Sequence, residues 1–475
     1  MKQRLQFVLM CAVLSVVMMS GCSLSSETIS DCFVSRQYKK LALPTFSSYI
    51  MNVASGDSGR IDVYYSIPYQ HLHFEKADNG FFGSYTFSVV LRSENGDILQ
   101  SKDVQRSVTA RTYDESVSSQ IDAFLLTVPA PPGTYMLEMS AVDNGSGLQY
   151  RRRKKITARN FHIENPPQKG FQLGDTSIAA SDFLLLENVT AGKNGISLRP
   201  AFPTSLALLK DSLGIFQEVY NVHAGDSLRV SFSYRVSKVT PPRPYYYSAP
   251  TALGYFRRFS PCGQKFDSVL YRKDSVMTAS SNGTLQLIQF YPKPPERYVE
   301  IVRTIVRTRN GISDSTVNSL KVLVTTPSFP DVVSPAELAD AMLFLARGSE
   351  TDSLLNAHTD SMRIAIIAGF WKRHGGAEKM QAFQQRLREA NELFTACMEG
   401  WKTPMGIVYL VCGPPEYVDC QASLYETWYY TAGSTTLSIP FRMVPQSDDT
   451  EPVYYDIVPY SINDYAWQYF VDRWR

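Results

Sequence analysis

The strongest constraint on the fold of this 475-residue chain is a two-residue alternation of apolar and polar side chains. It is clearest over residues 61–67, 85–91 and 228–236. Successive side chains of a strand point to opposite faces of a sheet, so the pattern predicts strands with one buried and one solvated face. Turn sequences, Asn95-Gly96 and Pro131-Pro132-Gly133, separate such stretches. Together these features predict antiparallel β-sandwiches.

Helical spacing replaces the alternation near residue 330. The sequence Ser334-Pro335-Ala336-Glu337 has the form of a capping box with proline at the first helical position. We expect a second helix over residues 352–373. Apolar residues recur at intervals of three and four over residues 376–399, which predicts a third. Beyond Gly400 we expect strands at residues 407–411, 427–430 and 437–443, and a last short helix at residues 463–474.

The first 22 residues have the layout of a bacterial export signal. Lys2 and Arg4 precede an apolar run over residues 7–19, which is too short to span a bilayer. Cys22 directly follows small residues, Ser20-Gly21, as in the lipobox, where the cysteine receives lipid and becomes the new N-terminus. We therefore expect lipid attachment at Cys22. The alternative is an ordinary cleaved signal with an incidental cysteine.

These patterns predict a multi-domain, β-rich protein. Its fold class is two tandem antiparallel, Ig-like β-sandwich domains, followed by a helical segment and a small α+β C-terminal domain. The Pro- and Gly-containing residues 165–170 separate the two sandwiches. The expected boundaries are 1–21 for the signal peptide, 22–45 for a tether, 46–164 and 171–328 for the sandwiches, and 333–475 for the helical and α+β part.

Charge and motifs exclude several function classes. The formal net charge of +2 gives no electrostatic reason to bind nucleic acid. The basic run over residues 151–155 fits a solvated edge strand, with a phosphate-rich ligand or lipid headgroup as the alternative. The chain has no Walker loop and no dinucleotide fingerprint, so we expect no small-molecule cofactor.

Two strings that resemble serine-hydrolase motifs lie in the wrong surroundings. Gly225-Asp226-Ser227-Leu228 opens an alternating strand in mid-chain, and Gly56-Asp57-Ser58-Gly59 leaves no room for a preceding histidine and aspartate. His71 and His73, two apart on one expected strand face, could supply two metal ligands, but no third ligand has matching spacing. We therefore predict no catalytic residue and no metal site.

The cysteines allow a disulfide in an exported protein. Five remain after Cys11 of the signal and Cys22, so at least one is unpaired within a monomer. Cys412 and Cys420 lie eight residues apart around a Gly-Pro-Pro turn and are the expected pair. Buried free thiols are the alternative.

The most distinctive motif is Gly400-Trp401-Lys402-Thr403-Pro404-Met405-Gly406. We interpret it as a helix end with a glycine stop, followed by a strand that ends in a rigid turn at Gly413-Pro414-Pro415. Trp401 would cover the helix–strand junction, and its indole N–H would need a partner. A structural corner is the favoured interpretation and a recognition surface the alternative. The motif residues are Gly400, Trp401, Thr403, Gly406, Gly413, Pro414 and Pro415.

This segment resembles the GWxTD-domain proteins, lipoproteins and exported proteins found mostly in Bacteroidota and their relatives. The resemblance extends to Phe370-Trp371-Lys372-Arg373, Arg386, Ala390-Asn391, Phe394 and Trp428, and to β regions at 63–74 and 218–221. Pro404 stands where the family has aspartate, and Met405 where arginine is usual, so any role of that acid–base pair is lost here. The family implies an architecture but no settled activity.

The export signal with its lipobox cysteine and the family resemblance together predict a lipid-anchored outer-membrane protein. We expect a non-catalytic binding or scaffold subunit of a cell-envelope complex for outer-membrane assembly or secretion. Its partners would be the membrane, through the lipid, and envelope proteins. Residues 23–27 lack the acidic run that often follows the lipidated cysteine of surface-exported proteins in this phylum, which favours the periplasmic face. An envelope hydrolase acting on glycan or peptide is the alternative.

Overall fold

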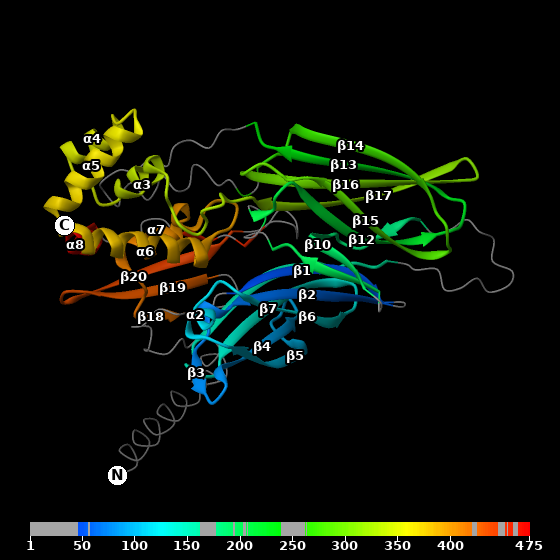
Figure 1. Cartoon of the computed structure of the whole chain (residues 1–475), viewed down its shortest axis with the longest axis horizontal. Coiled ribbons are helices and arrows are strands. Elements are labelled where there is room, and N and C mark those ends of the chain that lie inside the picture. Colours follow the sequence, from blue (N-terminus) through cyan, green and yellow to red (C-terminus); the bar gives the residue numbers. More distant parts are fainter. Residues whose placement is uncertain are drawn as a thin grey trace, which may run out of the picture.

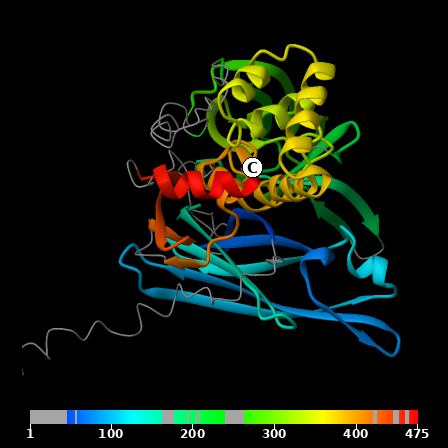
Figure 2. The same cartoon turned by 90° about the vertical axis from the view of Figure 1, so that its left-hand side faces the viewer.

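The computed structural model describes residues 46–475 except 56–57, 162–176, 193–194, 203–205, 207, 239–261, 263, 420–424, 445–451, 454 and 459–463. Several predicted features lie outside the described residues. These are the signal peptide, Cys22, the tether, the linker over residues 165–170, and Cys420. The described part is rich in antiparallel strands, followed by helices, a small sheet and a terminal helix (Figure 1). Viewed from its end, the strands of the first sandwich lie on one side and the yellow helices on the other (Figure 2).

The first β-sandwich packs a three-stranded sheet against a five-stranded sheet. The smaller sheet has the order β1 (Ser47–Ser55), β2 (Ser58–Pro68) and β6 (Ile121–Ala130). The larger contains β3 (Phe74–Ala77), β4 (Gly80–Arg92), β5 (Ile98–Ala110), β7 (Gly133–Asp143) and β8 (Gln149–Ala158). The alternation predicted over residues 85–91 is confirmed by the alternating burial of β4, and Tyr65 of β2 stacks on Phe87 of β4 with ring centroids 3.7 Å apart in the core. Strand β2 instead buries both faces, because Asp62 and Ser66 are buried as well.

The second β-sandwich has the same layered plan. One sheet contains β9 (Ala179–Ala180), β10 (Leu184–Gly192), β11 (Gly195–Pro200), β12 (Ser212–Val222) and β15 (Gly283–Pro292). The other has the order β14 (Ser268–Thr278), β13 (Ser227–Val236), β16 (Tyr298–Arg309) and β17 (Ile312–Leu323). Ser227 begins β13, as predicted, and Asp226 before it is buried and bonded to Arg309 at 2.8 Å. The lipase-like string is therefore the start of a strand.

Strand β1 belongs to two hydrophobic cores. Phe46, just before β1, lies in the core of the first sandwich, and the partly buried Ile50 of β1 packs against that core. Tyr49, Met51 and Val53 pack into the core of the second sandwich. Figure 1 shows β1 between β2 and β10 accordingly. The alternation of a strand thus serves two neighbouring domains at once.

The C-terminal part combines helices with a four-stranded sheet. The helices are α3 (Pro335–Met342), α4 (Ser349–Leu355), α5 (Asp360–Arg373), α6 (Gly376–Phe394), η5 (Gly400–Lys402), α7 (Pro404–Cys412) and α8 (Asp464–Trp474). The sheet has the order β18 (Tyr417–Asp419), β19 (Tyr425–Ala432), β20 (Thr435–Met443) and β21 (Tyr455–Ile457). Among the described residues, every helix is too short or too polar to cross a membrane.

The strand predicted over residues 407–411 is wrong, because these residues lie in α7. All nine residues of α7 are buried, so its sequence is apolar on every side and shows no helical period. A short, fully apolar run with β-branched residues cannot be told from a buried strand by pattern alone. The helix is set by its start: Thr403 caps its N-terminus and Pro404 occupies its first turn.

The other predicted helices need smaller corrections. Residues 352–373 form parts of two helices, α4 and α5, and the helix predicted over 376–399 ends at Phe394. Helix α3 does begin at Pro335, but the Ser334 side chain makes no capping hydrogen bond. Glu337, the expected partner in the capping box, instead accepts a hydrogen bond from Lys402 Nζ at 2.8 Å.

Candidate functional site

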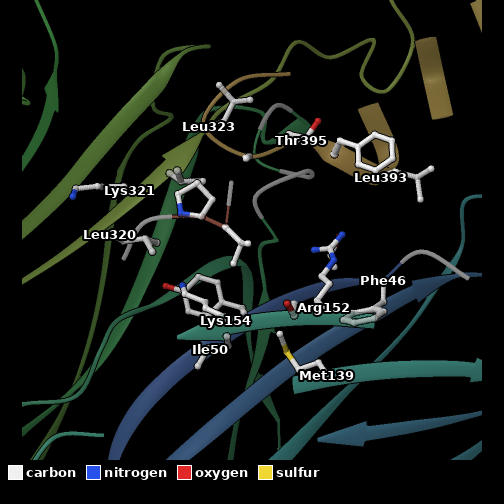
Figure 3. Close-up of a pocket in the computed structure, with 18 of the residues that line it drawn as sticks. Phe46, Ile50, Met139, Arg152, Lys154, Leu320, Lys321, Leu323, Leu393 and Thr395 are labelled. Carbon is white, nitrogen blue, oxygen red and sulfur yellow. The ribbon is translucent and has the colours of Figure 1, made fainter. Parts of the chain in front are cut away.

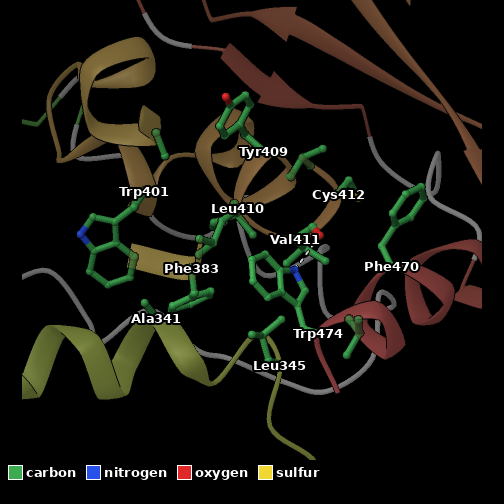
Figure 4. Close-up of a cluster of buried hydrophobic side chains, with 14 of the residues drawn as sticks. Ala341, Leu345, Phe383, Trp401, Tyr409, Leu410, Val411, Cys412, Phe470 and Trp474 are labelled. Carbon is green, nitrogen blue, oxygen red and sulfur yellow. Dashed lines mark hydrogen bonds between the residues drawn. The ribbon is translucent and has the colours of Figure 1, made fainter. Parts of the chain in front are cut away.

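The glycine-tryptophan motif forms a buried corner between α6 and α7 (Figure 4). The Trp401 side chain is fully buried, and its backbone N–H donates to Asn391 Oδ1 at 3.3 Å. Asn391 Nδ2 donates to the Pro330 carbonyl at 2.8 Å. The Thr395 hydroxyl donates to the Asn391 carbonyl at 2.7 Å and accepts the Gly400 N–H at 2.9 Å. These bonds fix the corner against the end of α6.

Two glycines of the motif are required by close backbone packing. A Cβ atom at Gly400 would lie 1.9 Å from the Ala390 carbonyl oxygen. A Cβ atom at Gly406 would lie 1.8 Å from the Gly400 carbonyl oxygen. Both distances are far below van der Waals contact, and both opposing atoms are backbone. Any side chain at either position would therefore push α6, η5 and α7 apart.

Thr403 connects η5 to α7. Its buried hydroxyl donates to the Gly400 carbonyl at 2.7 Å and accepts the Gly406 N–H at 3.0 Å. The second bond satisfies one of the backbone donors that the first turn of a helix leaves without a partner. Pro404, at the position where the family has aspartate, lies buried in that first turn.

Lys402 closes the corner on its outer side. Its ammonium lies 5.1 Å from the centroid of the Trp401 ring and pairs with Glu337 at 2.8 Å and Glu399 at 2.9 Å. Burial lowers the pKa of Lys402, but the two carboxylates outweigh it and raise the pKa above its ordinary value. The Trp401 indole N–H, for which we expected a partner, has none among the described residues. The corner is packed, and the choice between a structural corner and a recognition surface stays a prediction.

Gly413 of the motif and two residues outside it cap the other end of α7. Gly413 ends the helix with a φ of +85°. Arg386 of α6 donates to the Leu410 carbonyl at 3.3 Å, and its guanidinium carbon lies 4.7 Å from the centroid of the Trp474 ring. The Trp474 indole N–H donates to the Val411 carbonyl at 3.0 Å (Figure 4). Sequence reasoning missed this role of Arg386 and Trp474, because contacts so distant in sequence leave no local signal.

The predicted motif residues therefore divide into two groups. Gly400, Trp401, Thr403 and Gly406 meet at the start of α7, and Gly413 lies at its end. Pro414 and Pro415 are partly exposed and lead from α7 toward β18. The motif thus supports one buried helix at both ends.

The predicted Cys412–Cys420 disulfide is wrong. Cys412 is a buried free thiol at the end of α7, and burial raises its pKa well above the ordinary value. A thiol with a raised pKa is a poor nucleophile. The disulfide joins Cys262 and Cys397, whose Cα atoms lie 5.6 Å apart. Short spacing favoured the wrong pair, because a partner 135 residues away cannot be identified from spacing alone.

His71 and His73 do not share a strand face, contrary to the prediction. His71 ends the short helix η2 (Tyr69–His71), and His73 follows it before β3. The His71 Nε2 atom lies 3.9 Å from Glu392 Oε2 of α6, and burial, with a smaller effect of Arg388, lowers the pKa of His71 to about 4. The residues that the structure describes hold no cluster of three or more His, Cys, Asp or Glu that could bind a metal ion.

A cleft of about 910 Å³ opens where the three parts of the molecule meet (Figure 3). Its walls come from β1 and β8 of the first sandwich, β17 of the second and the end of α6. Apolar side chains from all three parts line it, among them Phe46, Ile50, Leu320, Leu323 and Leu393. Charged side chains also line it, both basic (including Arg152, Lys154 and Lys321) and acidic (Asp182, Glu392 and Glu426). Cavities of this size between domains are the usual location of ligand sites.

The basic run over residues 151–155 lies on β8, the last strand of its sheet in the described structure, as predicted. Arg151 and Arg153 pair with the buried Glu138 at 3.3 Å and 3.0 Å. Arg152 lies on the other face of β8. All four residues from 151 to 154 line the cleft.

Comparison with known proteins identifies the C-terminal part. Residues 311–475 match the family model of the GWxTD domain. The chain thus carries a GWxTD domain. The matched region starts at the turn before β17, so it includes the last strand of the second sandwich as well as the Trp401 corner. No curated protein matches the chain.

Solved structures that match the chain are distant. One is a calcium-binding mutant of Bacteroides uniformis beta-glucuronidase 2, with 10% identity and a TM-score of 0.17 over 24% of this chain and 13% of that chain. Another is red sea bream transglutaminase, with 8% identity and a TM-score of 0.15 over 58% of this chain and 31% of that chain. The chain thus spans less than a third of either protein. Similarity at this level carries no argument about function.

Proposed function

We propose that this protein is a lipid-anchored outer-membrane protein that acts as a non-catalytic binding or scaffold subunit of a cell-envelope complex, on the periplasmic face. Lipid would be attached at Cys22, and the partners would be envelope or outer-membrane proteins. The observation that carries the scaffold proposal is that its three parts are fastened together by several independent contacts. A subunit that holds partners at fixed positions needs such a fixed relation between its domains.

The two sandwiches are joined by β1, which contributes side chains to both of their cores. The second sandwich and the GWxTD domain are linked covalently through Cys262 and Cys397. Cys262 follows β13 and precedes β14, and Cys397 follows α6. A cross-link of this kind restricts relative motion of the segments that it joins.

The first sandwich also contacts the GWxTD domain directly. The Tyr150 hydroxyl of β8 donates to the Leu393 carbonyl of α6 at 3.3 Å. His71 lies beside Glu392 on the same helix. Helix α6 therefore touches the first sandwich near its C-terminal end, just before the residues that carry the disulfide.

The position of the GWxTD motif supports a non-catalytic role for the corner. Trp401 and Thr403 are buried, and Thr403 uses its hydroxyl to cap α7. Pro404 and Met405 replace the charged residues of the family pattern and lie within the buried α7. The corner thus presents no ionisable group of the motif to a substrate, apart from Lys402, which is held by two glutamates.

Affinity purification after mild detergent extraction tests the proposal. We expect the wild-type protein to co-purify with a reproducible set of envelope proteins, identified by mass spectrometry. The Cys262→Ser variant, which removes the covalent fastening, should recover fewer partners, whereas the control Cys412→Ala removes a thiol that takes no part in it. Recovery of a partner-free monomer, or hydrolysis of glycan or peptide by the purified protein, would contradict the proposal.

Lipid anchoring is tested separately by the Cys22→Ser variant. We expect this variant to move from the membrane fraction to the soluble fraction, and the wild-type N-terminal peptide to carry acyl chains in mass spectra. A Cys22→Ser variant that stays in the membrane fraction would disprove attachment at this residue.

A further inference from the structure

We propose that the three-domain cleft binds an anionic amphiphile, a molecule with an acyl chain and a carboxylate or phosphate head. This ligand site goes beyond the scaffold role and does not depend on it. The argument rests on Arg152, one of several cations that line the cleft, on the aromatic rings beside it, and on the apolar walls around it.

Arg152 is the residue that would bind the anionic head. Its guanidinium carbon lies 5.2 Å from the centroid of the Phe46 ring and 5.3 Å from that of Tyr150. The two rings meet edge to face with centroids 5.5 Å apart. Figure 3 shows Arg152 rising from β8 beside Phe46 into the space below Leu393. Aromatic rings orient the guanidinium but cannot neutralise its charge.

The neighbouring arginines are already paired. Arg151 and Arg153 contact Glu138, and Arg159 contacts Asp182 at 2.6 Å. Among the described residues, no carboxylate pairs with Arg152. An arginine cannot lose its proton at physiological pH, so a half-buried guanidinium without a counter-charge favours an anion from outside. The planar, forked group suits a carboxylate or a phosphate in particular.

The walls around Arg152 favour an apolar tail. Ile50 comes from β1, Leu320 and Leu323 from β17, and Leu393 from α6. These side chains surround the cavity from different domains (Figure 3). Concave, mostly apolar cavities with a few well-placed polar groups are typical of small-molecule sites. A free inorganic anion would leave this apolar surface in contact with water, whereas an acyl chain would cover it.

Calorimetric titration of the full-length protein with four probes tests the proposal. The probes are dodecanoate, dodecyl phosphate, 1-dodecanol and inorganic phosphate, each below its critical micelle concentration where it has one. We expect one binding site for dodecanoate or dodecyl phosphate, and at least tenfold weaker binding of 1-dodecanol and inorganic phosphate. The first two probes distinguish a fatty-acid head from a phospholipid-type head.

The Arg152→Gln variant locates the site. Loss of a charge-assisted contact should weaken binding of the anionic probe about tenfold and leave 1-dodecanol unchanged. The matched control is Arg272→Gln, which changes an exposed arginine of β14 that pairs with Asp274. Circular dichroism establishes that both variants fold. A second variant, Leu320→Trp, should weaken the anionic probe by filling the cleft while Arg152 stays in place.

Several results would overturn the proposal. These are equal binding by the wild type and Arg152→Gln, equal losses in Arg152→Gln and Arg272→Gln, and binding of inorganic phosphate as tight as that of dodecyl phosphate. Absence of binding by both anionic amphiphiles would do the same.

Discussion

Replacement of Thr403 by valine tests whether the motif acts as a helix cap. Valine has the shape of threonine but lacks the hydroxyl, so the substitution removes two hydrogen bonds without opening a cavity. The Gly400 carbonyl keeps a partner, because the Thr403 backbone N–H also donates to it at 3.0 Å. The Gly406 N–H, by contrast, loses its acceptor at 3.0 Å and stays buried.

The magnitude follows from that single orphaned donor. Loss of a threonine cap costs about 1 kcal/mol and up to about 2 kcal/mol. A buried donor left without a partner costs about 1–3 kcal/mol, and the two descriptions overlap. We therefore expect the free energy of unfolding of the GWxTD domain to fall by about 2 kcal/mol. For a domain of this size, that corresponds to a decrease in Tm of about 4–8 °C.

Tryptophan fluorescence during urea or thermal unfolding is the appropriate assay. All five tryptophans of the chain lie between residues 371 and 474, so their emission reports on the GWxTD domain within the intact protein. Thr403→Ser retains the hydroxyl and is the matched control, expected to stay within about 1 kcal/mol of the wild type. A valine variant as stable as the wild type, or a serine variant as unstable as the valine variant, would refute the capping role.

Three further predictions concern other parts of the molecule. Burial raises the pKa of Glu350, but hydrogen bonds from His374 and Arg475 outweigh it and lower the pKa from 4.5 to about 2. The wild type should therefore be more stable than Glu350→Gln by a constant amount above pH 4.5, and this difference should vanish as the pH falls toward 2. Melting curves at several pH values measure it. Arg303 is fully buried, and its Nε and Nη1 atoms have no hydrogen-bond partner in the described structure. Arg303→Met should therefore raise the free energy of unfolding by about 1–4 kcal/mol, measured in circular-dichroism melts. A clear decrease in the free energy of unfolding would contradict this prediction. Peptide mapping without reductant should recover Cys262 linked to Cys397, and Cys412 should react with thiol reagents only after unfolding; a link to Cys412 would refute the assignment.

The sandwich strands that could be predicted best are those that bury one face. At Tyr85, Phe87 and Val89 of β4 the alternation in sequence is the alternation of burial in the structure. Helix α7 could not be predicted in the same way, since a helix buried on all sides has no polar face to reveal its period. The decisive local signal was the Thr403-Pro404 start, which is easily outweighed by a run of β-branched residues.

The site depends on contacts that no local pattern encodes. The importance of Trp401 and of Gly400 and Gly406 could be recognised from the motif, but not the helix that they support. Cys262 and Cys397 lie 135 residues apart, and no repeating sequence pattern connects their two segments. Their pairing therefore follows from the tertiary structure alone. The cleft arises for the same reason, because β8, β17 and α6 approach one another only when all three parts have folded.

The double membership of β1 means that the two sandwiches cannot be treated as separable modules. A truncated protein that starts after residue 176 would lack Tyr49, Met51 and Val53, and the apolar residues that they cover in the second sandwich would face water. Such a fragment would aggregate more readily, because a newly exposed apolar patch promotes association.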